Sequence, residues 1–268
     1  MICKITKKII KPFMSFGQMP IANGFLKKKY FKKEFLFKME VGFSKDISLF
    51  QLNEHPKPTL MFNKNYPFFT SSSKYMIKHF KGYSKWIKKY YYKNTKNIIE
   101  IGSNDGTFLK NFKSNKTNIL GIEPSRNVAL IAKKNKINTV NKFFTFKTAK
   151  NLKKFKNKTD LICAANAICH IPNLKDLIKG IDILLSKKGK FIFEEPYLGS
   201  MYEKTSYDQI YDEHIFMFSI SSVKKIFNLF NFDLIDVQKQ KTHGGSMRYV
   251  IAREGEYNIK DIVKIGLN

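Results

Sequence analysis

The feature that most constrains this chain is a regular alternation of short apolar segments and amphipathic segments between residues 97 and 253. Short apolar runs bounded by turn residues predict buried strands, and longer segments with helical spacing predict helices. The predicted strands are 97–101, 118–122, 139–144, 160–164 and 190–194, and the predicted helices are 107–112, 127–134, 174–185 and 221–230. Strands that alternate with helices form right-handed crossovers and a mostly parallel sheet covered on both faces. The expected fold is therefore α/β and Rossmann-like.

Two further strands are predicted near the end of this region, at 233–239 and 247–253. A short segment with two adjacent glycines joins them, which is typical of a turn between antiparallel strands. We therefore expect an antiparallel pair at one edge of the parallel sheet.

The first 95 residues lack this regularity. Proline and glycine punctuate residues 1–60, which predicts a small irregular lobe with short strands near 35–37 and 47–52. Residues 73–92 have apolar side chains near helical spacing and predict a helix. The expected division of the 268 residues is a lobe at 1–60, a helical connector at 61–95, the α/β domain at 96–254 and the start of a further domain at 255–268.

The chain carries a formal net charge of +28, a value typical of nucleic-acid-binding proteins. Only Arg126, Arg248 and Arg253 among the 49 basic residues are arginines, and the lysines are spread along the whole chain. Proteins that read bases and phosphates favour arginine, because its planar guanidinium makes bidentate hydrogen bonds. We therefore expect a solvated basic surface and no specific nucleic-acid partner.

The compartment is indicated by three further observations. No apolar run approaches the roughly 18 residues of a membrane span. The first residues alternate apolar and charged side chains and lack the apolar middle of a signal peptide. The three cysteines, Cys3, Cys163 and Cys169, are too few and too scattered for a disulfide framework. A cytoplasmic protein without membrane association is expected.

A candidate cofactor site follows the first two strands of the α/β region. Gly102 and Gly106 let the backbone turn tightly and approach a ligand more closely than a Cβ atom would permit. Glu123 lies about 20 residues further on, where an acidic residue accepts hydrogen bonds from ribose hydroxyls in dinucleotide folds. Neither G-x-G-x-x-G nor G-x-x-x-x-G-K-[ST] is present, which disfavours NAD and ATP. These features favour S-adenosylmethionine, and a strand–turn–helix corner without a ligand is the alternative.

Ordered motifs along nearly the whole chain carry a resemblance to one family. They lie at 20–23 with 25–26, 51–52, 66–73, 100–106, 121–125 with 127–129, 166 with 170–172, 195–198, 211–214 and 243–248. In these motifs the chain resembles the S-adenosylmethionine-dependent C-methyltransferases that act on nucleotide-linked keto-deoxysugars. The resemblance implies a class I methyltransferase fold and a nucleotide-sugar substrate. It also implies cofactor-binding roles for Glu100, Gly102, Ser103, Asn104, Gly106, Glu123, Pro124 and Asn166.

Methylation at carbon needs a base that removes a proton beside a ketone, so that the enolate attacks the methyl group. A neutral imidazole accepts a proton near neutral pH, and the resemblance implies that His214 is the base and that Tyr211 and Glu213 position the sugar or the base. His170 follows the fourth strand at the carboxyl edge of the sheet, where it would contact the sugar or the oxyanion. The resemblance further implies substrate contacts by Tyr66, Tyr197 and His243.

A hydrogen-bonded structural histidine is the alternative for each histidine of this set. That structural role is the preferred interpretation for His55 and His79, whose neighbours in the sequence suggest no chemistry. Arg248 is alone on a predicted strand and is expected at the surface, although a contact with a phosphate is the alternative.

The N-terminal lobe of the family carries a structural zinc site built from two C-x-x-C pairs. In this chain the first pair falls on Cys3 and Thr6 and the second on Ser44 and Ile47, so that only Cys3 remains. Tetrahedral structural zinc needs four such ligands. We therefore expect no zinc and predict no metal ligands. The aromatic residues expected to hold the lobe by apolar packing instead are Phe13, Phe16, Phe35, Phe37 and Phe43.

Members of this family continue into a second α/β domain that helps to enclose the nucleotide sugar, whereas this sequence ends at residue 268. The cofactor site is expected to be retained, and a separate polypeptide that supplies the C-terminal domain is an expected partner. Three alternatives to the keto-sugar function stay open. The first is methylation of oxygen or of another small molecule, and the second is an inactive remnant or a subunit that needs a partner. The third is methylation of nucleic acid.

Overall fold

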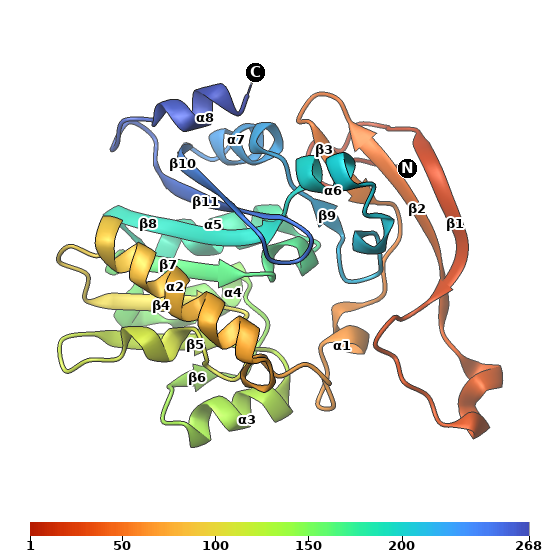
Figure 1. The fold of residues 1–268 in the computed structure, drawn as a ribbon, viewed down its shortest axis with the longest axis horizontal. Helices are drawn as coiled ribbons and strands as arrows, with labels where there is room; N and C mark the ends of the chain where they lie inside the picture. Colours follow the sequence, from red (N-terminus) through yellow and green to blue (C-terminus); the bar gives the residue numbers. More distant parts are fainter. Residues whose placement is uncertain (268) are drawn as a thin grey trace.

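The computed structural model describes residues 1–267 and contains a seven-stranded and a four-stranded sheet (Figure 1). The larger sheet consists of β4 (Asn97–Ile101), β5 (Asn118–Ile122), β6 (Thr139–Val140), β7 (Thr159–Ala165), β8 (Leu185–Pro196), β10 (Phe232–Gln240) and β11 (Ser246–Arg253). Its order is β10–β11–β8–β7–β4–β5–β6. Strands β4 to β8 pair in parallel, and β11 pairs antiparallel with β8 and β10. The predicted α/β fold with an antiparallel edge is confirmed.

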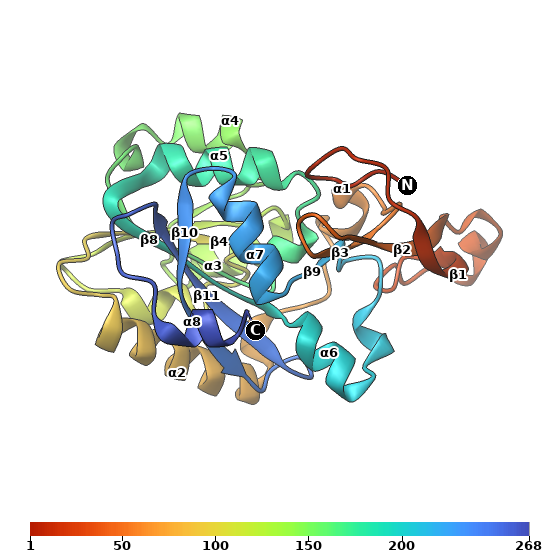
Figure 2. The ribbon, with the colours of Figure 1, turned by 90° about the horizontal axis from the view of Figure 1, so that it is seen from above.

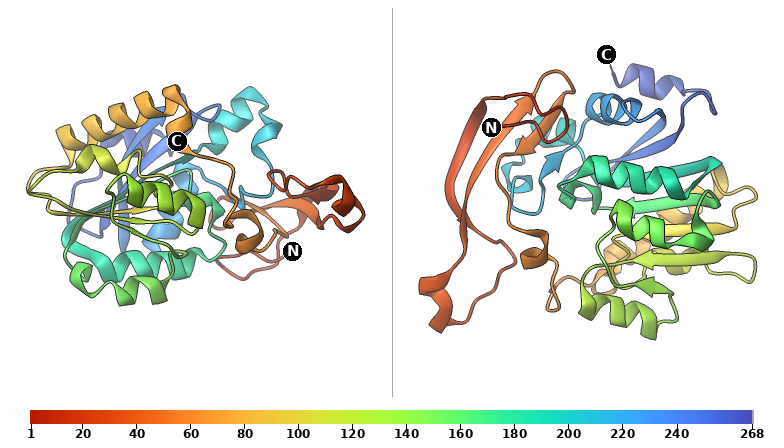
Figure 3. Two further views of the ribbon diagram at one scale, coloured as in Figure 1. Left: turned by 90° about the horizontal axis from the view of Figure 1, so that it is seen from below. Right: turned by 180° about the vertical axis from the view of Figure 1, so that it is seen from behind.

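Helices cover both faces of this sheet (Figures 2 and 3). They are α2 (Lys74–Tyr90), α3 (Arg126–Lys134), α4 (Phe146–Asn151), α5 (Leu174–Leu184) and α7 (Ile220–Asn228). Helices α2 and α3 lie on one face, and α4, α5 and α7 lie on the other. Ile192 of β8 packs on the α2 side, whereas its neighbours Phe191 and Phe193 pack on the α5 side. Because both faces are buried, the strands are apolar along their length.

The predicted strand at 139–144 is wrong beyond its first two residues. The N–H of Lys142 donates to the carbonyl oxygen of Val140 at 3.1 Å, which turns the chain away from the sheet. The turn places Phe143 in a cavity described below, and it packs Phe144 against Gly180 of α5. Side-chain burial outside the sheet, and not strand pairing, therefore explains this apolar run.

The predicted helix at 107–112 is a 3₁₀ helix, Leu109–Phe112, instead of an α-helix. The side-chain nitrogen of Asn111 donates to the carbonyl oxygens of Thr107 and Phe108 at 3.1 and 2.9 Å. This side chain competes for backbone acceptors that a continuing α-helix would use.

The N-terminal lobe is an antiparallel sheet that a later segment of the chain completes. Its strands, in sheet order, are β1 (Pro12–Pro20), β2 (Leu36–Ser44), β3 (Leu49–Leu52) and β9 (Phe216–Met217). Strands β1 and β2 form the long ribbon that extends beyond the α/β domain on the right of Figure 1. Helix α6 (Leu198–Lys204) packs against the apolar core of the lobe. The boundary predicted at residue 60 therefore leaves out one strand of this sheet.

The aromatic residues expected to hold the lobe are only partly the ones that do. Phe37 is buried and Phe16 is partly buried, but Phe13, Phe35 and Phe43 are exposed. The other buried members of this core are Met39, Val41, Phe50, Leu52, Ile210 and Met217. Phe43 pairs with Phe50 of β3 and shares the face of Val41, but it lies near the end of β2 and stays 38% exposed.

The lobe positions that correspond to zinc ligands in the family lie near one another. The backbone N–H of Thr6 donates to the Sγ atom of Cys3 at 3.4 Å, and the hydroxyl of Ser44 also contacts this thiol. Ile47 is buried in the same apolar core as Cys3. Hydrogen bonds and apolar contacts thus join the N-terminal segment to the β2–β3 turn.

A buried ion pair links β8 to β11. Nε of Arg248 donates to Oε2 of Glu194 at 2.6 Å, and His79 of α2 contacts Oε1 at 2.7 Å. Burial opposes the charge of Glu194, but its hydrogen bonds with His79 and the charge of Arg248 hold its pKa below the ordinary value. The surface position expected for Arg248 is wrong, because its guanidinium is buried 3.9 Å from the centre of the Tyr83 ring. His79 has the structural role expected for it.

The last described residues return to the α/β domain through α8 (Asp261–Ile265). The N–H of Lys260 donates to the carbonyl oxygen of Ile235 at 3.0 Å, and Val263 is fully buried.

In the lobe, Nδ1 of His55 lies 2.9 Å from the carbonyl oxygen of Pro56, a contact that fits its expected structural role. None of the helices within residues 1–267 combines the length and apolar character needed to cross a bilayer.

We expect Arg248→Met to lower the free energy of unfolding by about 3 kcal/mol, because it leaves the Glu194 carboxylate buried without its cation. Urea unfolding measures the change. Because the pKa of Glu194 is lowered in the folded state, the stability from its charge is present above the ordinary carboxyl pKa and is lost as the pH falls through the lowered value. The wild type and the variant should therefore converge in acid.

Lys239→Met is the matched control for this pair, because its ion pair with Glu203 is exposed on both sides. The loss of unfolding free energy in Lys239→Met should stay below about 1 kcal/mol. An Arg248→Met variant no less stable than this control would show that the buried pair does not hold β8 to β11.

Candidate active site

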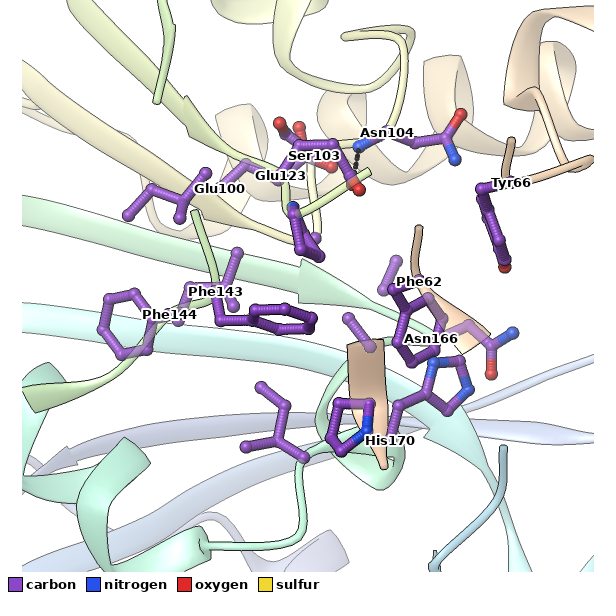
Figure 4. Close-up of a pocket in the computed structure, with 18 of the residues that line it drawn as sticks. Phe62, Tyr66, Glu100, Ser103, Asn104, Glu123, Phe143, Phe144, Asn166 and His170 are labelled. Carbon is purple, nitrogen blue, oxygen red and sulfur yellow. Dashed lines mark hydrogen bonds between the residues drawn. The ribbon is translucent and has the colours of Figure 1, made fainter. Parts of the chain in front are cut away.

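A cavity of about 420 Å³ lies at the carboxyl ends of β4, β5 and β7 (Figure 4). Its walls come from the loops after these strands, from α1 (Pro58–Met61) and from the segment that follows α1. The predicted site residues on its lining are Tyr66, Glu100, Gly102, Ser103, Asn104, Glu123, Pro124, Asn166, His170 and His243. Open α/β sheets bind ligands at this edge, where the strand order reverses.

The two glycines of the first loop have different roles. Both have positive φ, +69° at Gly102 and +80° at Gly106, which favours glycine. A Cβ atom on Gly102 would lie 2.6 Å from the Cβ of Ala167, so glycine permits the close approach of the loops after β4 and β7. Gly106 is not part of the cavity lining, and a Cβ atom there would meet Ile137 at 2.9 Å. Gly102 thus shapes the cavity and Gly106 shapes the loop behind it.

The carboxylate of Glu123 is held by the backbone. Oε1 accepts a hydrogen bond from the N–H of Ser125 at 2.7 Å, and Oε2 accepts one from the N–H of Asn104 at 2.9 Å. Burial raises the pKa of this carboxyl. Each carboxylate oxygen has a further lone pair. The side chain can therefore accept two hydroxyl hydrogen bonds, as a ribose diol requires.

Glu100 is buried behind the glycine loop. Its burial, together with nearby Asp105 and Glu123, raises the pKa of this carboxyl well above the ordinary value. Its Oε2 atom has no hydrogen-bond partner within residues 1–267, and the same is true of the Ser103 hydroxyl. These groups line the cavity with unused hydrogen-bonding capacity.

The side chain of Asn104 holds the chain that covers the cavity. Its Oδ1 atom accepts from the N–H of Thr70 at 2.9 Å, and its Nδ2 atom donates to the carbonyl oxygen of Phe68 at 3.2 Å. Nδ2 of Asn127 donates to the carbonyl oxygen of Tyr66 at 2.8 Å. These amides fix residues 66–70 over the cofactor end of the cavity.

Six phenylalanines of the lining are not among the site residues predicted from the sequence, namely Phe62, Phe68, Phe80, Phe108, Phe143 and Phe144. Phe62 and Phe68 flank Tyr66 in an irregular segment without strand or helix periodicity. Phe143 belongs to a run that predicted a strand. The only available signal was the motif at 66–73, which marks the segment but does not say which side chains face inward.

The loop after β7 carries the next part of the site. Asn166 has φ of +48°, and its N–H donates to the carbonyl oxygen of Glu194 at 2.8 Å. Oε1 of Glu195 accepts from the N–H groups of Ala167 and Ile168 at 2.9 and 2.7 Å. Burial raises the pKa of Glu195 to about 7. The loop thereby places Asn166 and His170 on the cavity wall (Figure 4).

Aromatic rings from three segments form a column beside the cavity. The ring centroid of His170 lies 5.4 Å from that of Phe62 and 5.4 Å from that of His214, with nearly parallel planes in both pairs. The Tyr211 ring lies 4.3 Å from His214. Burial lowers the pKa of His214 to about 4 and that of His170 well below its ordinary value. The structure thus brings three predicted catalytic residues together, with neutral imidazoles near pH 7.

His214 lies behind the cavity lining, and its two ring nitrogens differ in their hydrogen bonds. Nδ1 lies 2.8 Å from the carbonyl oxygen of Gln209, which only accepts hydrogen bonds, so Nδ1 carries the proton. Nε2 is buried and has no hydrogen-bond partner in the described part of the chain. A buried imidazole with a free Nε2 lone pair is suited to accept a proton.

The segment before His214 is fixed by the N-terminal lobe. The N–H of Ala22 donates to Oδ1 of Asp212 at 3.2 Å, and Nδ2 of Asn23 donates to Oε1 of Glu213 at 2.8 Å. Burial raises the pKa of Glu213, and burial and the Glu213 carboxyl raise that of Tyr66. Glu213 therefore lies between Asn23 and Tyr66, just behind the cavity lining.

The two remaining predicted substrate residues differ in position. His243, with φ of +49°, lines the cavity from the turn between β10 and β11. Tyr197 begins α6, and its N–H donates to the carbonyl oxygen of Gly245 at 3.0 Å, but its side chain does not line the cavity. Tyr197 therefore supports the turn that carries His243.

Solved structures share this fold. A protein from Pyrococcus horikoshii OT3, PH0226, is 13% identical, with a TM-score of 0.56 over 70% of this chain and 95% of that chain. A SAM-dependent methyltransferase from Archaeoglobus fulgidus is 15% identical, with a TM-score of 0.52 over 68% of this chain and 100% of that chain. At these identities the likeness establishes the fold, a class I methyltransferase fold, and no more.

Sequence comparison adds the family. C-methyltransferase NovU from Streptomyces niveus is 26% identical over 236 residues, which are 87% of this chain and 56% of NovU. The chain therefore spans little more than half the length of this curated relative. The profile described as a methyltransferase domain matches residues 75–237. This match covers more than half of the chain and contains the glycine loop, Glu123, His170 and His214. The chain belongs to the methyltransferase domain family.

Proposed function

We propose that this enzyme transfers a methyl group from S-adenosylmethionine to a carbon atom of a nucleotide-linked keto-deoxysugar through an enolate. The observation that carries the proposal is the buried, unpartnered Nε2 atom of His214 beside a cavity of cofactor size. The printed name of the 26% identical relative, a C-methyltransferase, supports carbon as the methylated atom. The ordered motifs of the sequence support a keto-sugar substrate.

The lining of the cavity fits S-adenosylmethionine, the cofactor of this enzyme. Glu123 has two carboxylate lone pairs free for the ribose hydroxyls. Phe143 presents an aromatic face for the adenine, and Asn166 lies on the opposite wall, where the methionine end would bind. The bound cofactor supplies an electrophilic methyl group.

The residues of this chain provide the proton chemistry. Nε2 of His214 accepts the proton from the carbon beside the ketone. Meanwhile Nδ1–H continues to donate to the carbonyl oxygen of Gln209, and this hydrogen bond stabilises the imidazolium. Burial raises the pKa of Tyr66 and Tyr211, so both phenols stay protonated and can donate hydrogen bonds to sugar oxygens. His170 is neutral and can donate to the oxyanion that develops on the ketone.

A further part of the proposal follows from the share of NovU that this chain matches. The chain spans 56% of NovU, so the substrate-binding set in this chain need not be complete. We include in the proposal a further domain that encloses the nucleotide. Enzyme and substrate would meet in the cytoplasm.

Glu123→Gln should weaken S-adenosylmethionine binding by about 10- to 100-fold, because a charged acceptor of two hydroxyl hydrogen bonds is lost. Isothermal titration calorimetry on the purified chain measures the dissociation constants. Glu203→Gln, an exposed carboxylate on α6, is the control and should leave the affinity unchanged. Equal affinity in Glu123→Gln and the wild type would remove Glu123 from the cofactor site.

His214→Asn should lower the methylation rate by about 10²–10⁴-fold, since it removes the base, and should leave S-adenosylmethionine affinity unchanged. A second measurement separates carbon from oxygen methylation. Without cofactor, the wild type should exchange the hydrogen beside the ketone of a keto-sugar nucleotide with D₂O, as followed by NMR, and His214→Asn should not.

His55→Asn, which changes a histidine far from the rings, should retain both the rate and the exchange. An oxygen-methylated product formed by the wild type, or undiminished exchange in His214→Asn, would refute the enolate route.

A further inference from the structure

A second chemistry is possible at the column of rings, because a cysteine lies beside its two histidines. Sγ of Cys169 and one ring nitrogen from each of His170 and His214 lie within 4.8 Å of one another, and all three residues are buried. Cys169 has no role in the proposed methyl transfer. Thiolate and imidazole are the ligands that zinc prefers in proteins.

His214 is already in the state that a metal requires. Nδ1–H of His214 is held by the carbonyl oxygen of Gln209 at 2.8 Å, which leaves the Nε2 lone pair free. Metal-binding histidines commonly have this arrangement, in which the second ring nitrogen donates to a carbonyl or carboxylate oxygen. Nε2 of His170 is likewise buried without a partner in residues 1–267. Two buried ring nitrogens without hydrogen-bond partners are a cost that a bound cation would remove.

The thiol also has a route for its proton. Sγ of Cys169 donates to Oδ1 of Asn166 at 3.9 Å, and the nearby Glu195 carboxyl has an Oε2 atom without a hydrogen-bond partner in the described chain. When a metal binds, the S–H bond breaks and an Sγ–metal bond forms. The proton passes to Glu195 or to water, and no change of oxidation state is involved.

We propose that Cys169, His170 and His214 bind one zinc ion, with a fourth coordination position facing the cavity. Ligand atoms around tetrahedral zinc, at bonds of about 2.0–2.3 Å, lie about 3.3–3.8 Å apart. Side-chain movements of roughly 1 Å close the set from the observed spacing of up to 4.8 Å. The fourth position faces the cavity because His170 lines it. This site is separate from the lobe around Cys3.

Zinc and methyl transfer exclude each other in this site. The consequence rests on the proposed role of His214, because its Nε2 lone pair cannot bind a metal and accept a proton at the same time. Zinc should therefore inhibit the methylation, and a chelator should restore it. Metal binding itself is measured without cofactor or sugar, so its failure is distinguishable from failure of the proposed function.

Titration of the chelator-treated full chain with Co²⁺ tests the site, because cobalt bound to a thiolate gives a charge-transfer band in the near ultraviolet. The wild type should show this band at one equivalent, and Zn²⁺ should displace it. Cys169→Ser should abolish the band, and His170→Ala or His214→Asn should weaken Co²⁺ binding by more than about tenfold. Cys163→Ser is the matched control, a buried cysteine on the opposite face of the sheet, and should retain the band.

Circular dichroism establishes that each variant is folded, and the two histidine variants keep the test decisive if Cys169→Ser does not fold. Folded wild type without a thiolate band at millimolar Co²⁺ would overturn the proposal. A band that survives in Cys169→Ser and disappears in Cys3→Ser would also overturn it, because the ion would then lie in the lobe.

Discussion

The site depends on two adjacent carboxylates at the end of β8 that point to opposite faces of the sheet. Glu194 accepts hydrogen bonds from Arg248, His79 and the hydroxyl of Thr242, and Thr242 begins the turn that carries His243 into the cavity. Glu195 accepts the N–H groups of Ala167 and Ile168 and so fixes the loop that carries Asn166 and His170. Burying a carboxylate is unfavourable unless hydrogen bonds compensate it. Two buried acids at one strand end thus fix the two loops that carry Asn166, His170 and His243.

The N-terminal lobe is part of this site and not an appendage. Ala22 and Asn23 bind the carboxyl groups of Asp212 and Glu213, which directly precede His214. Strand β9 follows the same segment and pairs with β3 of the lobe. The lobe thereby holds the segment that carries His214, the proposed base, on both sides of this residue. This arrangement explains why the motif at 20–23 accompanies the motif at 211–214 in the sequence, although about 190 residues separate them.

Much of the fold was predictable because buried strands and amphipathic helices leave a periodic pattern, and the seven strands of the large sheet were all located. The errors fall where side chains outside regular structure determine the path, as at Phe143, or where a side chain competes with the backbone, as at Asn111. Arg248 was misplaced for a different reason. A lone arginine on a strand is ambiguous in the sequence, and only the fold brings Glu194 within 2.6 Å of it. The column of rings was predicted in part, because Tyr211, His170 and His214 lie in motifs, whereas Phe62 and Cys169 carry no such signal.

The charge of the chain is distributed in a way that bears on the substrate. The described residues that line the cavity include no lysine and no arginine, although the net charge is +28. Apolar walls keep both imidazoles neutral, so that each ring has one nitrogen lone pair free. The same walls offer nothing to neutralise a diphosphate. In the proposed reaction the cavity therefore holds the cofactor and the sugar ring, and the phosphates of the nucleotide lie outside it, where the lysines of the surface or a partner domain can meet them.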